Sequence, residues 1–175
     1  MGRLTGKRIV ITGSSRSLGR HFALACAAEG ASLIINGTNA EALAAVAKEV
    51  AALGAPVHAV CGSVAATAVC NELVDTCVDR FGGIDVLVNN AGIYPDSHVD
   101  ILTTTRDLLA LGMNTNAFGT ILTVQALLPL LEQSQDPRVI NISSGMGALD
   151  GLTTTAPSYC LSKLALNGAT IMLAQ

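Results

Sequence analysis

Residues 8–19, RIVITGSSRSLG, decide the fold of this chain. Three apolar residues, Ile9 to Ile11, stand before Thr12 and a run of glycine and serine, and a segment of helical period follows at 18–29. A buried strand that turns directly into a helix offers free backbone N–H groups and the positive end of a helix dipole at one point. Small residues in such a turn let the backbone approach a pyrophosphate closely. The stretch therefore favours a nucleotide-binding loop, although the glycine spacing alone also fits an ordinary strand-to-helix turn.

The same alternation of short apolar runs and helical segments continues along the whole chain. Strands are predicted at 8–12, 32–36, 57–60, 85–89 and 139–142, and helices at 18–29, 40–53, 66–81, 104–111, 115–132 and 158–173. Continuous apolar strands separated by helices predict a parallel sheet covered on both faces. Right-handed crossovers then give an α/β fold of the Rossmann type, a doubly wound sheet in three αβα layers. Gly30, Gly54 and Gly82 follow three of the helices, where left-handed ends are expected.

Length and composition narrow the class of protein. The 175 residues suffice for one domain, 1–175, half of the residues are apolar, and the net charge is −3. The sequence has no basic stripe that would suggest binding to nucleic acid, and no lysine-rich helix that would suggest binding to a membrane surface. The five cysteines form no CxxC pair and the three histidines are scattered, so no metal site is expected. Without a signal peptide, and with an apolar run at 117–131 too short to span a bilayer, a cytoplasmic protein is expected.

Polar clusters stand at three further places along the chain. Residues 89–92 (NNAG) follow the fourth strand, residues 141–145 (NISSG) follow the fifth, and residues 159–163 (YCLSK) lie in the last helix. The carboxyl ends of parallel strands meet at one edge of a sheet, where doubly wound folds bind their ligands. All of these clusters are expected at that crevice, and this agreement favours the functional interpretation of the glycine loop over a plain turn.

Together these motifs resemble the signatures of the short-chain dehydrogenase/reductase family. Residues 12–19 (TGSSRSLG), 89–92, 116–119 (NAFG), 142–145 (ISSG) and 159–163 stand in the order of that family and span nearly the whole chain. The sequence is most similar to single-domain reductases, which include 3-oxoacyl-carrier-protein reductases and small-alcohol dehydrogenases. The resemblance implies an oxidoreductase that interconverts a carbonyl and an alcohol of a small-molecule substrate with a nicotinamide cofactor.

The sequence departs from the family pattern at two positions of the expected cofactor site. Ser17 replaces the usual second glycine of the loop, and a serine is tolerated there if its φ is negative. Ser63 stands where many members carry an aspartate near the adenine ring. The full set expected to bind the cofactor comprises Gly13, Ser15, Arg16, Ser17, Leu18, Gly19, Asn36, Thr38, Ser63, Asn90, Ala91, Gly92, Tyr159 and Lys163.

The end of the second strand indicates which cofactor is used. NAD-preferring sites usually place an acid there to bind the ribose 2′-hydroxyl, whereas residues 36–39 read NGTN. Arg16 stands where NADP-dependent relatives hold the 2′-phosphate, which a guanidinium can bind in a bidentate way. NADP(H) is therefore favoured, with NAD(H) as the alternative. Otherwise Arg16 is an ordinary exposed arginine, and Thr38 a helix N-cap paired with Glu41.

Tyr159 and Lys163 are the candidate catalytic pair. They are one helical turn apart, so both side chains can share a face, and a nearby ammonium favours the phenolate form of a tyrosine. Tyr159 can then act as general acid and base. The resemblance implies that Lys163 also holds the nicotinamide ribose, that Ser144 hydrogen-bonds the substrate oxygen, and that Asn116 anchors a water leading to Lys163.

Two features near this pair leave questions open. Residues 145–157 make a loop about two residues longer than in many relatives, so the distance from Ser144 to Tyr159 is not determined by the motif. Cys160 is either a reactive thiol near a helix start or, more simply, a small buried residue.

The predicted helices 115–132 and 158–173 are apolar nearly all round, which predicts a second covered side. By resemblance, relatives pair through these helices, so a homodimer or homotetramer is expected; the alternative is that a C-terminal segment covers them. The chain stops before the last two strands and the substrate lid of relatives, which predicts about five strands, an exposed fifth strand and low activity of the chain alone.

Two other functions stay open. One is a non-catalytic nucleotide-binding or interaction module of the same fold. The other is an extended-type sugar-nucleotide epimerase or dehydratase, for whose second domain the chain has no room.

Overall fold

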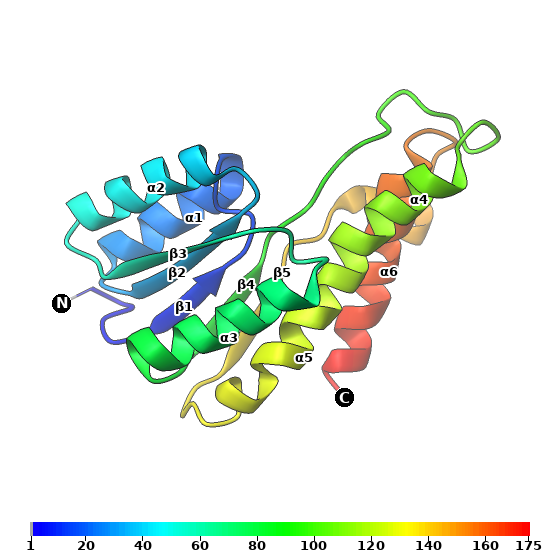
Figure 1. Ribbon diagram of the computed structural model, residues 1–175. Coiled ribbons are helices and arrows are strands. Elements are labelled where there is room, and N and C mark those ends of the chain that lie inside the picture. The colour runs from blue at the N-terminus through cyan, green and yellow to red at the C-terminus, as the bar shows by residue number, and fades with distance from the viewer. Residues whose placement is uncertain (1) are drawn as a thin grey trace.

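Residues 2–175 are described by a computed structural model, and within them five parallel strands form one sheet (Figure 1). The strands are β1 (Arg8–Ile11), β2 (Ser32–Gly37), β3 (Val57–Cys61), β4 (Val86–Asn89) and β5 (Arg138–Asn141). Their order is β3-β2-β1-β4-β5, and each neighbouring pair is parallel. The chain moves outward from β1 to β3 and then starts again beside β1 with β4. This reversal confirms the predicted doubly wound Rossmann fold and places its switch point between β1 and β4.

Six α-helices connect and cover the strands within the same residues. They are α1 (Ser17–Ala28), α2 (Ala40–Ala52), α3 (Thr67–Phe81), α4 (Arg106–Gly112), α5 (Gly119–Leu131) and α6 (Pro157–Leu173). Gly30, Gly54 and Gly82 have φ of +88°, +80° and +67°, which confirms the left-handed ends expected after three helices.

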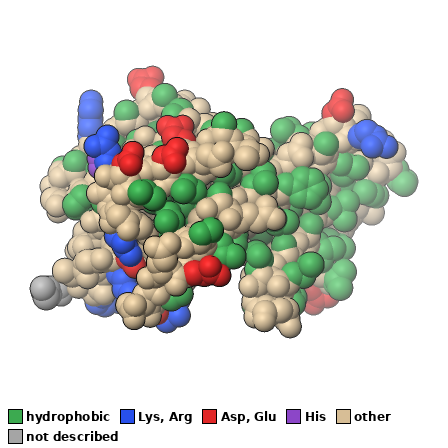
Figure 2. Space-filling model, turned by 60° about the horizontal axis from the view of Figure 1, so that its bottom comes forward, with side chains coloured by type: hydrophobic (Ala, Val, Ile, Leu, Met, Phe, Trp, Pro, Cys, Tyr) green, Lys and Arg blue, Asp and Glu red, His purple; other side chains and the backbone are tan. Residues whose placement is uncertain are grey.

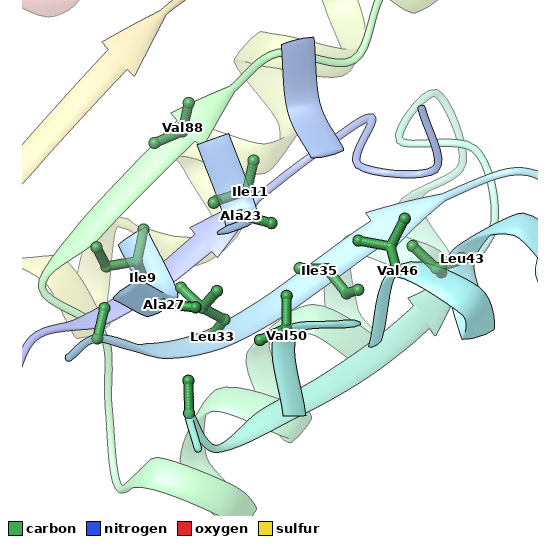
Figure 3. Close-up of a cluster of buried hydrophobic side chains, with 12 residues drawn as sticks. Ile9, Ile11, Ala23, Ala27, Leu33, Ile35, Leu43, Val46, Val50 and Val88 are labelled. Atoms are coloured by element: carbon green, nitrogen blue, oxygen red, sulfur yellow. The ribbon is translucent and has the colours of Figure 1, made fainter. Parts of the chain in front are cut away.

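One face of the sheet packs on α1 and α2, as Figure 3 shows. Alternate residues of each strand point to this face, because the side-chain period of a strand is two. Ala23 and Ala27 of α1 are one turn apart and both buried, and their small side chains let that helix lie close to the strands. The labelled members of this cluster are Ile9, Ile11, Ala23, Ala27, Leu33, Ile35, Leu43, Val46, Val50 and Val88.

The opposite face packs on α3 and α5. Val10 and Ile34, which alternate with the residues of the first cluster, meet apolar side chains of these two helices there. The helical members are Leu73, Cys77, Val124, Leu127 and Leu131. Two covered faces give the three αβα layers that the apolar strands predict.

The boundary between α4 and α5 corrects the sequence prediction. Separate helices were expected at 104–111 and 115–132, but the polypeptide stays helical from α4 through a π-helical segment, Met113–Phe118, into α5. Gly112 is a contact residue and not a break, because a Cβ there would lie 2.2 Å from Oγ of Ser158 in α6. Helical period alone does not reveal such a contact.

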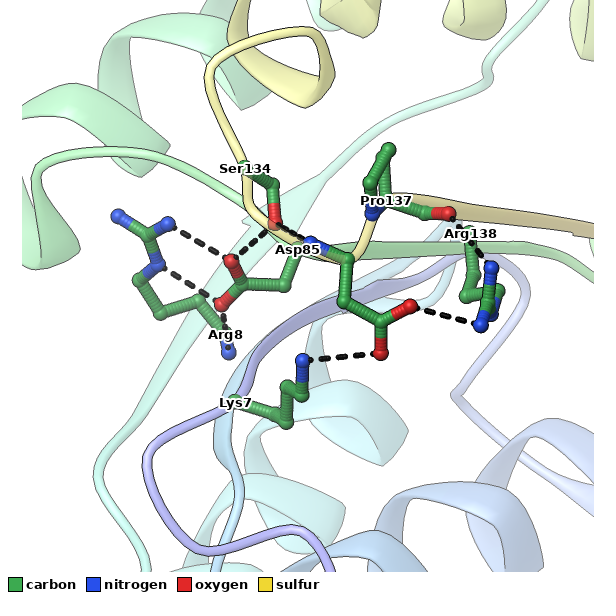
Figure 4. A network of polar contacts seen from close by, with 7 residues as sticks. Lys7, Arg8, Asp85, Ser134, Pro137 and Arg138 are labelled. Carbon is green, nitrogen blue, oxygen red and sulfur yellow. Dashed lines mark hydrogen bonds and ion pairs between the residues drawn. The ribbon is translucent and has the colours of Figure 1, made fainter.

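A polar network ties together the starts of β1, β4 and β5, at the end of these strands opposite their carboxyl ends (Figure 4). The Asp85 carboxylate accepts hydrogen bonds from the Arg8 guanidinium at 2.8 and 3.0 Å, from the Arg8 backbone N–H at 2.9 Å and from Ser134 Oγ at 2.7 Å. The Arg8 guanidinium holds the pKa of Asp85 well below its usual range. Asp136 pairs with Lys7 and Arg138 nearby.

β5 is an edge strand within the described residues, as expected. Val139 and Ile140 are both exposed on it, and the end of α6 exposes Ile171 and Met172. Among residues 2–175, no helix is both long and apolar enough to cross a membrane.

Candidate active site

A cleft of about 820 Å³ lies at the carboxyl ends of the strands. Its walls come from the loops that follow β1, β2, β3, β4 and β5 and from α6. Every residue expected to bind the cofactor lines it: Gly13, Ser15, Arg16, Ser17, Leu18, Gly19, Asn36, Thr38, Ser63, Asn90, Ala91, Gly92, Tyr159 and Lys163. The fold thus brings together motifs that are up to 150 residues apart, from 13 to 163.

The glycine loop and the NNAG segment form one hydrogen-bonded unit. Asn90 Nδ2 donates to the carbonyls of Thr12 and Gly13 at 3.0 and 3.1 Å, and Thr12 Oγ1 accepts from the N–H groups of Asn90 and Ala91. Gly13 permits this approach because a Cβ there would lie 2.7 Å from Cα of Ala91. Its φ of +68° also favours glycine.

The side chains of this loop leave polar groups free for a ligand. Ser15 Oγ is buried without a hydrogen-bond partner, in a space that Gly37 keeps open. Arg16 is exposed and takes part in no ion pair among residues 2–175. A buried hydroxyl without a partner and an unpaired guanidinium both fit the hydroxyl and phosphate groups of a dinucleotide, so the residues present fit the expected cofactor.

Tyr159 and Lys163 reach the cleft from the first turns of α6. Lys163 is only 5% exposed, and its Nζ donates to the carbonyl of Ile142 at 2.8 Å. Burial lowers the pKa of this ammonium. Its Nζ is 5.9 Å from the centre of the Tyr159 ring, and that ring also packs on the Tyr94 ring, at 4.4 Å between centres. The cleft therefore places a cation and a phenol side by side.

Comparison with known proteins identifies the family. The family model described as short chain dehydrogenase matches residues 7–175, nearly the whole chain. The chain belongs to the short-chain dehydrogenase family.

Several relatives resemble this short-chain dehydrogenase over most of its length. An uncharacterized oxidoreductase of Methylorubrum extorquens is 34% identical and covers 99% of the chain, which spans 68% of that protein. A 3-oxoacyl-[acyl-carrier-protein] reductase of Synechocystis is 35% identical over 85% of the chain and 60% of its own length. For hydroxysteroid dehydrogenase-like protein 2 of Bos taurus the identity is 34%, and the shares covered are 81% and 35%. The chain thus spans about a third to two thirds of these relatives.

A solved structure supports the same assignment. A structure from Pseudomonas syringae that is assigned to the short chain dehydrogenases superimposes with a TM-score of 0.91 at 29% identity, over 98% of this chain and 69% of the other.

Ser17 of this short-chain dehydrogenase does not adopt the expected backbone. A negative φ was predicted to let serine replace the usual glycine, but φ is +47°. The condition given for a serine here is therefore not met, because the turn into α1 takes a left-handed residue at this place. Such a conformation costs a residue with a Cβ about 1–2 kcal/mol.

The end of β2 also differs from one of the predicted alternatives. The N-cap of α2 is Asn39, whose Oδ1 accepts from the Ala42 N–H at 2.8 Å, so the alternative of a Thr38 cap paired with Glu41 is wrong. Thr38 stays exposed at the cleft. Asn36 uses both amide hydrogens on the carbonyls of Val60 and Gly62, and so joins β2 to the end of β3.

Asn116 and Ser144 lie near the cleft without lining it. Asn116, in the π-helical segment, is fully buried; its Nδ2 donates to Ile93 O and Ser162 Oγ, and its Oδ1 accepts from the Ile93 N–H. Both amide hydrogens of Asn116 are used in these bonds, so it can hold a water only by accepting a hydrogen bond at an oxygen. Ser144 Oγ accepts from the Met146 N–H at 3.2 Å, while the neighbouring Ser143 lines the cleft.

Two residues beside Tyr159 were not found by sequence reasoning. Asp96 is 1% exposed and accepts the backbone N–H groups of Ser158 and Tyr159, and Tyr94 packs on the Tyr159 ring. No local sequence pattern predicts the contacts of these two residues with Tyr159, because the contacting residues are more than sixty positions apart in the sequence. Cys160 is buried, and burial, followed by the Asp96 carboxylate, raises the pKa of its thiol, so the simpler interpretation as a buried residue holds.

Proposed function

We propose that this short-chain dehydrogenase is an NADP(H)-dependent oxidoreductase that interconverts a carbonyl and an alcohol group of a small molecule. The observation that carries the proposal is the single cleft in which the glycine loop, the NNAG segment, Tyr159 and Lys163 converge. The names of two relatives, an oxoacyl reductase and a hydroxysteroid dehydrogenase-like protein, describe the same class of reaction on different substrates. They support the reaction class and leave the substrate open.

Each side chain of the site has a role in this proposal. Tyr159 gives a proton to the substrate oxygen during reduction and removes it during oxidation, a contribution of about a hundred- to ten-thousand-fold in rate. Lys163 supports the phenolate and holds the cofactor ribose. The Ser144 hydroxyl accepts a bond from Met146 and keeps its own proton to donate to the substrate oxygen. Asn116 holds a water that leads to Lys163. A bound nicotinamide would supply or receive the hydride.

The preference for NADP(H) rests on charge at the end of β2. Residues 36–39 carry no carboxylate that would repel a 2′-phosphate, and the Arg16 guanidinium is free at the cleft. The charged 2′-phosphate of NADP(H) gains more from a positive partner at this place than the neutral 2′-hydroxyl of NAD(H) does. NAD(H) is the alternative outcome of the test.

We further propose that the chain forms a homodimer or homotetramer through α5 and α6. On the face seen in Figure 2, hydrophobic side chains gather over the half of the molecule that contains α4, α5 and α6, whereas most charged side chains lie over the other half. Phe118, Leu128 and Leu161 are exposed apolar residues at or on these helices. An unpaired apolar surface of this kind usually marks an interface.

Cofactor titration tests the nucleotide site. We expect NADPH to bind more tightly than NADH by cofactor fluorescence, and a hundredfold excess over Kd to stabilise the fold by roughly 2.7 kcal/mol. Arg16→Gln should weaken NADPH binding by about tenfold or more, because a hydrogen bond to a charged group is worth about 1.5–3 kcal/mol. The affinity for NADH should not change. The matched control is Arg20→Gln, one turn further along α1 and paired with Glu49. Equal affinities for both cofactors would contradict the NADP(H) assignment.

Replacing Tyr159 by Phe tests catalysis. This variant should still bind cofactor but lose turnover of carbonyl substrates by at least about a hundredfold, because the acid–base hydroxyl is gone. The measurement is a cofactor-oxidation assay across a panel of ketones and oxo-thioesters. Turnover that the replacement leaves unchanged would contradict the acid–base role of Tyr159. Cofactor binding without turnover by the unaltered chain would instead favour the non-catalytic binding module.

A further inference from the structure

The segment from Asn90 to Ile101 runs from the glycine loop to the start of α6. At one end Asn90 is bonded to Thr12 and Gly13, as described above. In its middle, the backbone of Ile93 is held by the Asn116 side chain on both its N–H and its carbonyl. At the far end it pairs with the loop before α6: the Ala156 N–H donates to Val99 O at 2.9 Å, and the Ile101 N–H donates to Thr154 O at 2.7 Å. The segment is therefore fixed against the helix that carries Tyr159.

Asp96 lies between these contacts and bonds to the backbone of Tyr159 itself. Its Oδ2 accepts from the Ser158 N–H at 2.5 Å, and its Oδ1 accepts from the Tyr159 N–H at 3.3 Å. The first N–H groups of a helix have no partner within the helix, and Pro157 at the start of α6 has none to offer. A carboxylate also interacts favourably with the positive end of the helix dipole.

The start of α6 needs such an external partner. Ala156, which precedes the helix, is fully buried and left-handed, with φ +55°, and its side chain cannot cap the helix. Residues with a Cβ persist in this conformation only where surrounding structure holds them. Two residues before Asp96, the Tyr94 ring packs on the Tyr159 ring with an interplanar angle of 37°. The same short segment thus contacts both the main chain and the side chain of Tyr159.

We propose that Asp96 is a positioning residue for Tyr159: its buried carboxylate fixes the first turn of α6 and thereby the place where the phenol enters the cleft and meets the Tyr94 ring. Its relevance to turnover rests on the proposed function, whereas the placement of the ring does not. Asp96 exchanges no proton and touches no reacting atom in this arrangement.

The composition of the chain offers a direct measurement of the ring placement. The protein contains two tyrosines, Tyr94 and Tyr159, and no tryptophan, so its circular dichroism in the tyrosine region of the near ultraviolet reports this pair. Tyr94→Phe and Tyr159→Phe define the spectrum without the pair. We expect Asp96→Asn and Asp96→Ala to lose most of the pair signal while the far-ultraviolet spectrum stays that of the unaltered protein.

The matched control removes a cap from a neighbouring helix. Thr105 Oγ1 accepts from the Leu108 N–H at the start of α4, and Thr105→Ala should lower stability without changing the tyrosine signal. If Asp96→Ala does not fold, Asp96→Asn decides, because it keeps the volume and one acceptor oxygen. An unchanged tyrosine signal in the folded Asp96 variants would overturn the proposal, whatever the outcome of the cofactor titration.

Kinetics extend the same test to the reaction. In Asp96→Asn, kcat should fall about tenfold to a hundredfold, as misplacement of a catalytic group predicts, with NADPH affinity unchanged. A variant that loses the tyrosine signal but keeps the original kcat would also overturn a positioning role. Failure of NADPH to bind the unaltered protein would contradict the proposed function alone.

Discussion

Ser17 illustrates how a single backbone angle affects both stability and binding. Its φ of +47° lies in the region that favours glycine, and it stands in the turn that faces the cleft. Its carbonyl lies 2.7 Å from Nδ1 of His21, a contact that helps to hold this conformation. The strain is confined to a loop that β1 and α1 hold at its two ends.

We predict that Ser17→Gly raises the free energy of unfolding by about 0.5–1 kcal/mol, since relief of the left-handed conformation exceeds the added entropy of the unfolded chain. Chemical denaturation measures the difference. Ser144→Gly is the matched control: its φ is −152°, so glycine relieves nothing there and should destabilise. A Ser17→Gly variant less stable than the unaltered protein would show that the serine side chain makes up for the strain.

At the scale of elements, the pairing of β1 with β4 depends on Arg8 and Asp85. The Asp85 carboxylate joins the start of β1, the residue before β4 and the loop after α5, and it is largely buried. Because the folded pKa lies below the unfolded value of about 3.9, this pair contributes stability above about pH 4 and loses it as the pH falls through the folded pKa.

Asp85→Asn should therefore lower the free energy of unfolding at neutral pH by about 2–3 kcal/mol, the value of charged hydrogen bonds, and should flatten the decline of stability below about pH 4. Denaturant titrations across the acid range measure both effects. Asp136→Asn, which removes a carboxylate from an exposed pair in the same region, should cost less than about 1 kcal/mol. Equal losses in the two variants would contradict the special role of Asp85.

For the whole molecule, the uneven distribution of apolar surface predicts self-association. Phe118 is 48% exposed at the junction of the π-helical segment and α5. We expect Phe118→Glu to shift the protein from dimer or tetramer to monomer in sedimentation experiments, because a charge cannot be buried at an apolar contact without a partner. Leu102→Glu, at a loop residue that is 90% exposed, is the control and should leave the association unchanged. A protein that is already monomeric at micromolar concentration would contradict the proposed interface.

Local patterns in the sequence predicted the layers of the doubly wound sheet, and together with the family resemblance they predicted the motifs that line the cleft. Apolar runs such as residues 9–11 form strands because every side chain in them is buried, and the residues after them meet because parallel strands end at the same edge. The positive φ of Gly30 and Gly54 was likewise foreseeable, since only local sterics decide it. These features follow from neighbours within a few positions.

What the tertiary structure alone decided depends on contacts between distant segments. Ser17 takes a left-handed turn imposed by its surroundings, Ser144 stands just outside the cleft wall, and Asp96 meets Tyr159 across more than sixty residues. Helical period could not show that Gly112 continues a helix pressed against Ser158. The amino-acid sequence by itself thus determined which motifs meet at the cleft. Only the packing of loops against α6 decided how each motif is held and that Asp96 and Tyr94 join Tyr159, because contacts between remote segments follow no local sequence pattern.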